Sequence, residues 1–235
     1  MTLFYAPDIA VDLLLPAEEA VHAVNVLRLT EGSEITLTDG KGFFYRATIR
    51  RAHPRHCEVA VLERRQPLPL WPYRIHIAVA PAKSADRTEW FLEKATETGI
   101  HAVTLLKCHR SERREMKTAR LEKVMISAMK QSQQAALPKL TGMTPFRTFI
   151  DQPFDGCKFI AHCAENGTSL PLLKHVYRAG EHALILIGPE GGFTPEEIGV
   201  AAVFGFTPVS LGPSRLRTET AALAACHAIH ILNDY

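Results

Sequence analysis

Two arginines and a glutamate stand close together near the carboxyl end of the chain. Arg215, Arg217 and Glu219 lie between an apolar stretch and an apolar helical pattern. Arginines at a helix amino terminus oppose the helix dipole, so a further interaction should justify their placement. The alternative is a surface ion pair at a helix start, which contributes little to stability. We therefore treat these residues as candidates for contact with a ligand.

A glycine-rich loop lies a short way upstream. Gly188, Gly191 and Gly192 bracket Pro189 and Glu190, which permits sharp turning and close approach of a ligand to the main chain. The glutamate can accept hydrogen bonds, although a plain strand-to-helix turn is the alternative. Both loops join an apolar strand to a helix. Ligands usually bind at such junctions, at the carboxyl edge of an α/β sheet, so the two loops indicate one composite site.

Several well-defined sites are excluded by the motifs that the sequence lacks. It contains no Walker-type phosphate loop, no G-x-G-x-x-G with a suitably spaced acidic residue and no G-x-S-x-G elbow. The five cysteines are scattered and form no C-x-x-C pair. His227 and His230 lie three residues apart, but their neighbours are apolar. We expect no metal.

From about residue 73 onward, apolar strands alternate with helical patterns, which predicts an α/β domain over 73–235 with a mainly parallel sheet covered on both faces. The expected strands are 75–80, 102–107, 158–162, 183–187 and 208–212, and the expected helices are 86–98, 118–135, 169–178, 195–204 and 218–232. Thr194 and Glu197 fit a capping box for the helix at 195. The last helix is apolar nearly all round, so it should be buried within the domain or against another subunit.

The first seventy residues have a different pattern, which predicts a separate small β-barrel domain over 1–70. Two alternating segments, 34–38 and 43–49, flank an Asp39–Gly40 turn, and a third strand follows at 57–62. A helix is expected over 17–28. Three prolines in the segment 66–72 indicate an extended linker to the second domain.

Composition and charge restrict the partners. The net charge is only +2, but basic residues cluster at 50–56 and again at 107–123. Each cluster alone could be a solvated surface, whereas two together favour a phosphate-backbone partner. The sequence has no apolar run long enough to span a bilayer and no secretory signal, so we expect a cytoplasmic protein without a membrane partner.

The two loops carry a specific resemblance. Gly-Pro-Glu-Gly-Gly-Phe-Thr-Pro-Glu-Glu at 188–197 and Leu-Gly-Pro-Ser-Arg-Leu-Arg-Thr-Glu-Thr-Ala-Ala at 211–222 closely resemble the signature loops of the bacterial 16S ribosomal RNA uracil-N3 methyltransferases. That family belongs to the SPOUT class of knotted RNA methyltransferases. The segments 22–29 and 37–40 look like its amino-terminal PUA-like domain, and Glu93-Lys-Ala-Thr-Glu-Thr-Gly99 resembles a helix of the family.

The resemblance implies the fold, the cofactor and the partners. It implies an α/β domain with a carboxyl-terminal trefoil knot and a PUA-like RNA-binding domain, S-adenosyl-L-methionine as cofactor, 16S ribosomal RNA or the small ribosomal subunit as substrate, and a homodimer. By the same resemblance, one set of residues should line the cofactor pocket: Leu186, Gly188, Gly191, Gly192, Leu211, Gly212, Leu216 and Arg217.

Methylation at N3 of uracil requires charge stabilisation and a proton acceptor. We expect Arg217 to stabilise negative charge on the uracil oxygens, or else to bind the cofactor. Glu219 or Glu190 could accept the N3 proton, and Glu219 could instead orient Arg217. RNA docking is expected at Arg28, Arg50, Arg51, Arg55 and Arg110. A SPOUT enzyme with another RNA target, or a non-catalytic RNA-binding module in ribosome assembly, is the alternative function.

Overall fold

The computed structural model describes residues 2–163 and 169–234 of the chain. The chain divides into two compact units, Met1–Leu70 with Ile126–Leu137, and Trp71–Met125 with Pro138–Tyr235. The division passes through α3 (Thr118–Gln131), so the last turns of this helix and the following residues group with the first unit.

The first unit contains a four-stranded sheet with the order β1-β2-β3-β4. Its strands are β1 (Leu3–Tyr5), β2 (Glu34–Thr38), β3 (Phe44–Arg51) and β4 (Glu58–Arg65). The predicted hairpin is confirmed, because β2 pairs antiparallel with β3 and Thr38 lies opposite Phe44. Asp39 stabilises the connecting turn by accepting hydrogen bonds from the backbone N–H groups of Lys41 (2.8 Å) and Phe43 (3.2 Å). Strand β1 was not predicted from the sequence, because it is only three residues long.

The expected helix over 17–28 is shorter and changes its winding. It begins as α1 (Ala17–Val21) and continues as a π-helical turn, His22–Val26. Arg28 follows in the left-handed region, with φ of 56°. Few residues other than glycine adopt this conformation, and here it directs the chain away from the helix. The helix packs Ala20 and Ala23 onto the apolar core of the unit.

The second unit contains a six-stranded sheet with the order β10-β8-β9-β5-β6-β7. Its strands are β5 (Ile75–Val79), β6 (Ala102–Lys107), β7 (Lys139–Pro145), β8 (Cys157–Ala161), β9 (Ala183–Ile187) and β10 (Thr207–Val209). All described neighbours in this sheet pair in parallel, which confirms the predicted sheet type. Strand β7 was not predicted from the sequence, because it is an edge strand with a glycine, a terminal proline and no fully buried residue.

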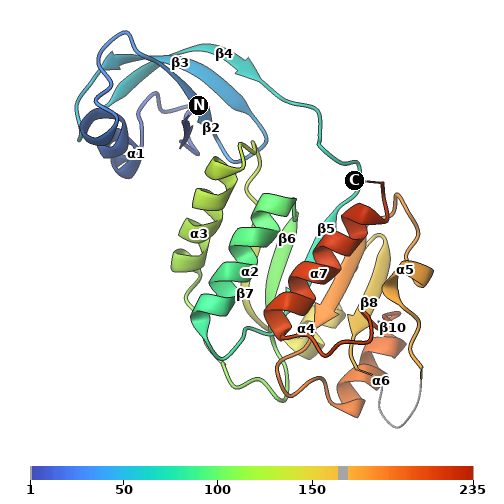
Figure 1. Cartoon of the computed structure of the whole chain (residues 1–235). Coiled ribbons are helices and arrows are strands. Elements are labelled where there is room, and N and C mark those ends of the chain that lie inside the picture. The colour runs from blue at the N-terminus through green and yellow to red at the C-terminus, as the bar shows by residue number, and fades with distance from the viewer. Residues whose placement is uncertain (1, 164–168, 235) are drawn as a thin grey trace. The chain divides into compact units, whose positions relative to one another are not determined.

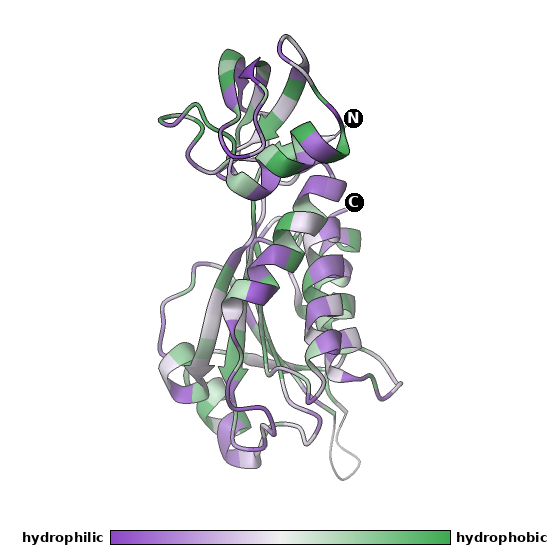
Figure 2. Cartoon of the chain, turned by 90° about the vertical axis from the view of Figure 1, so that its left-hand side faces the viewer, coloured by the Kyte–Doolittle hydropathy of each residue, from purple (hydrophilic) through white to green (hydrophobic). Residues whose placement is uncertain are grey.

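Helices cover both faces of this sheet. They are α2 (Ala85–Thr98), the first part of α3, α4 (Phe146–Ile150), α5 (Leu173–Val176), α6 (Pro195–Val203) and α7 (Thr218–Ile231). Figure 1 shows α2 and α7 side by side against the sheet. Phe146 and Phe149 of α4 and Ala201 of α6 join a separate core with Leu184 and Leu186 of β9. Figure 2 shows hydrophilic and hydrophobic residues alternating around the longer helices, as burial of one side requires.

Three helix predictions need separate comment. The capping box is confirmed, because the Thr194 hydroxyl accepts from the Glu197 N–H and the Glu197 carboxylate accepts from the Thr194 N–H. The helix expected over 169–178 is wrong in extent: only Leu173–Val176 is helical, since Leu172 bridges to Ser210 in an extended conformation. The last helix is buried along one side through Ala222, Ala225 and Cys226, whereas Ile231 is 57% exposed.

The parallel sheet brings four loops to one edge. Because all its strands run in the same direction, the connections after β5, β6, β9 and β10 leave from the carboxyl edge, at the lower end of this unit in Figure 1. These connections are residues 80–84, 108–117, 188–194 and 210–217. They include both loops that the sequence analysis singled out.

Candidate active site

The glycine loop after β9 needs glycine for two different reasons. A Cβ on Gly188 would lie 3.1 Å from the Phe193 ring, and one on Gly191 would lie 3.2 Å from Cβ of Arg110. Gly192 has φ of 70°, and its N–H donates to the Pro189 carbonyl at 2.8 Å. Crowding therefore selects glycine at the first two positions, and backbone conformation selects it at the third.

The loop after β10 leaves its backbone open. Gly212 has φ of 134°, and a Cβ placed on it would have no described atom within 4 Å; the same is true of Gly192. The Ser210 hydroxyl accepts from the Gly212 N–H at 3.2 Å and donates to the Gly212 carbonyl at 3.1 Å, which fixes the turn. Leu211 is half-buried and Leu216 is exposed. Both loops thus have backbone positions where a ligand could approach the main chain.

Hydrogen bonds connect these loops to their neighbours. The Thr218 hydroxyl, in the first turn of α7, donates to the Gly188 carbonyl at 3.1 Å. The Glu190 carboxylate accepts from the Lys83 N–H at 3.0 Å, and Arg113 Nη2 donates to the Lys83 carbonyl at 2.6 Å. The connections after β5, β6 and β9 and the start of α7 therefore form one bonded cluster. The hydrogen bond from the Lys83 N–H means that Glu190 positions the loop after β5.

Arg110 has a role that the sequence analysis did not predict. Its Nη1 donates to the carbonyl oxygens of Gly191 at 2.9 Å and Phe193 at 3.4 Å. The neighbouring His109 N–H donates to the Glu197 carboxylate at 2.8 Å. The guanidinium group that was expected on RNA thus supports the glycine loop in this structure. A basic cluster in sequence does not distinguish a phosphate contact from a backbone carbonyl contact.

Leu186, which we expect to line the cofactor pocket, lies in the core of the second unit. Its side chain is fully buried in β9, within the core that includes Phe146, Phe193 and Ala201. Neighbouring strands cover it on both sides, because it pairs with Ala78 of β5 and Ile160 of β8. Its side chain packs within this core, and its role in lining the cofactor pocket stays a prediction.

Arg217 and Glu219 both line a cavity, but they have different environments. Arg217 is the N-cap residue of α7 and is exposed, as is Arg215. Glu219 lies two residues into the helix, with a side chain only 10% exposed, and its Oε1 is 3.7 Å from Nε of Arg87 in α2. The carboxylate benefits from the helix amino terminus and from this guanidinium group. The ion pair therefore joins Glu219 to Arg87, which the sequence analysis did not single out.

The same cavity has a volume of about 350 Å³ and is lined by Asp86, Arg87, Trp90, Arg217, Glu219 and Thr220. Arg87 and Trp90 are three residues apart and therefore share one side of α2. The sequence shows this spacing, but it does not show that the start of α7 lies opposite these two residues. The sequence analysis consequently missed the α2 side of this cavity.

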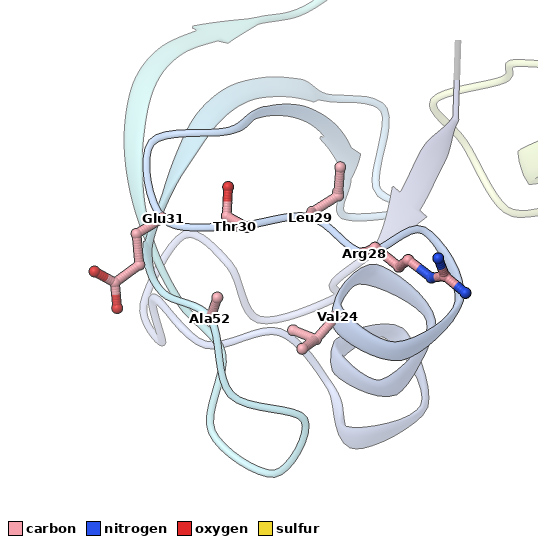
Figure 3. A pocket seen from close by; sticks show the side chains of 6 residues that line it. All are labelled: Val24, Arg28, Leu29, Thr30, Glu31 and Ala52. Carbon is pink, nitrogen blue, oxygen red and sulfur yellow. The ribbon is translucent and has the colours of Figure 1, made fainter.

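The remaining basic candidates lie in the first unit. Arg50 and Arg51 end β3, Arg55 follows in the next loop, and all three are exposed. Arg51 lies 3.7 Å from Glu58. Arg28 lines an open hollow of about 510 Å³ with Val24, Leu29, Thr30, Glu31 and Ala52; Figure 3 shows its guanidinium group pointing away from Glu31. These four arginines are thus exposed or at the rim of a hollow.

Two buried thiols and one histidine have structural surroundings. Burial raises the pKa of Cys226 to about 12 and raises that of Cys108 further still, so both thiols stay protonated. His230 Nδ1 bonds the Tyr73 hydroxyl at 2.8 Å within the fold. Among residues 2–163 and 169–234 there is no group of three histidine, cysteine, aspartate or glutamate residues that could hold a metal. The helices of the described part include none long and apolar enough to cross a membrane.

Comparison with known proteins gives two family matches. An RNA methyltransferase domain model matches residues 69–230, and an RNA methyltransferase PUA domain model matches residues 15–62. A solved structure described as a probable rRNA-methyltransferase from Porphyromonas gingivalis is 45% identical, with a TM-score of 0.95, covering 100% of this chain and 99% of that one.

Two further relatives extend these matches. The structure of a ribosomal RNA small subunit methyltransferase E from Neisseria gonorrhoeae bound to S-adenosyl methionine is 30% identical, with a TM-score of 0.86, covering 99% of this chain and 98% of that chain. Ribosomal RNA small subunit methyltransferase E of Bacillus subtilis is 28% identical over 92% of this chain and 88% of its own length.

Proposed function

Since the chain belongs to the RNA methyltransferase family, with an RNA methyltransferase PUA domain at its amino-terminal end, we propose that it methylates N3 of a uridine in 16S ribosomal RNA. Support comes from the relatives that carry the name ribosomal RNA small subunit methyltransferase. The signature loops at 188–197 and 211–222 support the choice of uracil N3. Such a substrate would place the protein in the cytoplasm.

The observation that carries this proposal is the bonded arrangement of the two loops with the start of α7. Thr218 bonds to the Gly188 carbonyl, while its chain neighbours Arg217 and Glu219 line the adjoining cavity. Backbone open to a ligand is thus coupled to a cation and a carboxylate. Methyl transfer to a nitrogen that carries a proton needs both kinds of group.

S-adenosyl-L-methionine fits the loops after β9 and β10. The space beside Gly192 and Gly212 is open, so a ligand could approach the main chain there. A Cβ on any other residue would occupy that space. Those glycines, with Gly188, Gly191, Leu211 and Leu216, would hold the cofactor, and Leu186 would contribute main chain only. When bound, the cofactor supplies an electrophilic methyl group. Arg110 and Glu190 then act as positioning residues, because their bonds hold the loops.

Glu219 of α7 and Arg217, which precedes this helix as its N-cap, take the two chemical roles. Glu219 accepts the N3 proton, and Arg217 stabilises negative charge that spreads onto the uracil oxygens. Glu190 is less suited as the acceptor because it does not line the cavity and its carboxylate holds the loop after β5 by accepting the Lys83 N–H. If Arg217 only binds the cofactor, its replacement will weaken cofactor binding and leave the chemical step unchanged.

The proposed RNA contacts of the first unit are Arg28, Arg50, Arg51 and Arg55. Their exposure and the PUA domain match support this assignment. We also propose a homodimer and a carboxyl-terminal trefoil knot, as the resemblance implies. The exposed Ile231 on α7 is consistent with a subunit contact. Light scattering at micromolar concentration tests the dimer, and a monomer mass would refute it.

The decisive experiment is methylation of ribosomal RNA and of small subunits with labelled cofactor, followed by mass spectrometry of the nucleosides. We expect 3-methyluridine in 16S RNA. A methylated ribose or a different base would establish another RNA target, and absence of cofactor binding in calorimetry would favour a non-catalytic module. Arg217→Ala should slow single-turnover methylation at saturating cofactor and RNA, whereas an unchanged rate would reject its catalytic role.

A further inference from the structure

The cavity beside Glu219 has one exposed aromatic wall. Trp90 of α2 is 41% exposed, so part of its ring is open to a ligand. It shares the cavity with Arg87 of the same helix and with Arg217 and Glu219 of α7. Aromatic side chains beside guanidinium groups are typical of surfaces that stack nucleic acid bases.

The polar groups of the cavity restrict which base could enter. An ionised carboxylate only accepts hydrogen bonds, and a guanidinium group only donates them. Arg87 and Arg217 therefore offer donors, and Glu219, held 3.7 Å from Arg87, offers an acceptor. Asp86 and Thr220 complete the lining.

Uracil has the complementary edge. Its N3–H donor stands between two carbonyl acceptors, whereas cytosine has an acceptor at N3 and an amine in place of one carbonyl. A cytosine in the same position would place its N3 lone pair against a carboxylate and its amine against a guanidinium group. Because opposed donors and acceptors weaken binding, this cavity should favour uracil over cytosine.

We propose that this cavity is the acceptor-base pocket, in which Arg87 selects uracil and Trp90 stacks on it. The proposal rests on the proposed function, since it names the part of the site that receives the RNA base. Arg87 acts twice: it donates to a uracil carbonyl, and its ion pair holds the Glu219 carboxylate. Trp90 supplies binding that does not depend on base identity.

The first test uses variants of α2 with RNA that the wild-type protein methylates. Because an aromatic side chain that stacks on a base adds to RNA affinity, Trp90→Ala should raise KM for RNA roughly 5- to 150-fold, and Trp90→Phe should restore most of the affinity. Arg87→Ala should lower kcat/KM by about tenfold or more, with partial rescue in Arg87→Lys. Arg178→Ala, which alters an exposed ion pair with Glu181, is the matched control.

Cofactor affinity and thermal unfolding distinguish a base pocket from a structural role. All four variants should bind S-adenosyl-L-methionine with wild-type affinity in calorimetry and unfold near the wild-type temperature. Wild-type KM in Trp90→Ala together with wild-type kcat/KM in Arg87→Ala would overturn the proposal. A raised KM that occurs only in variants that also lose cofactor binding or stability would overturn it as well, because the residues would then act through the fold.

The second test changes the hydrogen-bond pattern itself. A short RNA spanning the mapped uridine is compared with the same RNA carrying cytidine there, in the wild type and in Glu219→Gln. The wild type should bind the uridine RNA at least tenfold more tightly, and Glu219→Gln should reduce this preference, since an amide can donate to the cytosine N3. Equal preferences in the two proteins would reject the pocket. A wild type that forms no 3-methyluridine would instead reject the proposed function.

Discussion

Arg110 donates a hydrogen bond from Nη1 to the Gly191 carbonyl oxygen at 2.9 Å, so a side chain after β6 supports the glycine loop after β9. The same residue crowds Gly191, where a Cβ would lie in tight contact at 3.2 Å from Cβ of Arg110. The two positions therefore depend on each other. A change at either one should alter the shape of the loop that we propose for cofactor binding.

Arg110→Ala should weaken cofactor binding while leaving RNA affinity nearly unchanged. Loss of a hydrogen bond from a charged donor at an exposed position costs about 1 kcal/mol, which corresponds to roughly a fivefold higher Kd for S-adenosyl-L-methionine. Calorimetry measures this change. Arg114→Ala, an exposed member of the same basic cluster, is the control. A flattened salt dependence of RNA binding in Arg110→Ala would instead support the RNA contact expected from the sequence.

Gly212→Ala should reduce cofactor affinity by about tenfold. The backbone at φ of 134° disfavours any side chain by roughly 1–2 kcal/mol, and the added methyl group would point into open space beside the loop. Gly199→Ala is the matched control, because Gly199 lies in α6 without a positive φ and its Cβ would meet no described atom within 4 Å. This control should gain about 0.5–1 kcal/mol of stability. Unchanged cofactor affinity in Gly212→Ala would remove that loop from the cofactor site.

Replacing Arg50 and Arg51 together by alanine should weaken RNA binding broadly. Each lost phosphate contact reduces the slope of log K against log salt concentration by about 0.7–0.9. Filter binding at several salt concentrations measures the slope. Lys174→Ala, an exposed cation of the second unit, should leave it unchanged. A double variant with the wild-type slope would place the RNA elsewhere on the protein.

Stability should fall on acidification from pH 7 to pH 5, in part through His76. Burial lowers the pKa of this histidine to about 4, with Lys139 adding to the effect, and its Nε2 is 2.9 Å from the Thr104 hydroxyl. The unfolded chain binds the proton near pH 6.5, so the stabilisation is complete above that value and is lost as the pH falls towards 4.

At pH 5 this one histidine should cost roughly 2 kcal/mol of unfolding free energy. His76→Gln should therefore flatten the pH dependence measured by urea unfolding at the two pH values, even if it lowers stability at both. The exposed His175→Gln should leave the dependence as in the wild type. An unaltered slope in His76→Gln would mean that its proton affinity does not change on folding.

Local signals in the sequence predicted most of the regular structure. Apolar runs located the inner strands of the parallel sheet, the Asp39 turn located the hairpin, and the Thr194–Glu197 pair located the start of α6. Each of these depends on neighbours in the chain. Strands β1 and β7 escaped prediction because a short or half-buried edge strand has a weak pattern of its own.

Sequence alone also established the two glycine loops and the charged residues of α7, because residue type and spacing carry that information. Only the tertiary structure decided which residues they meet. It brought Arg87 to Glu219, directed Arg110 to the Gly191 carbonyl and buried Leu186 in the core. The physical reason is that parallel strand order and helix packing join segments far apart in the chain. A charged side chain looks the same in sequence whether it contacts solvent, a carbonyl oxygen or an opposite charge.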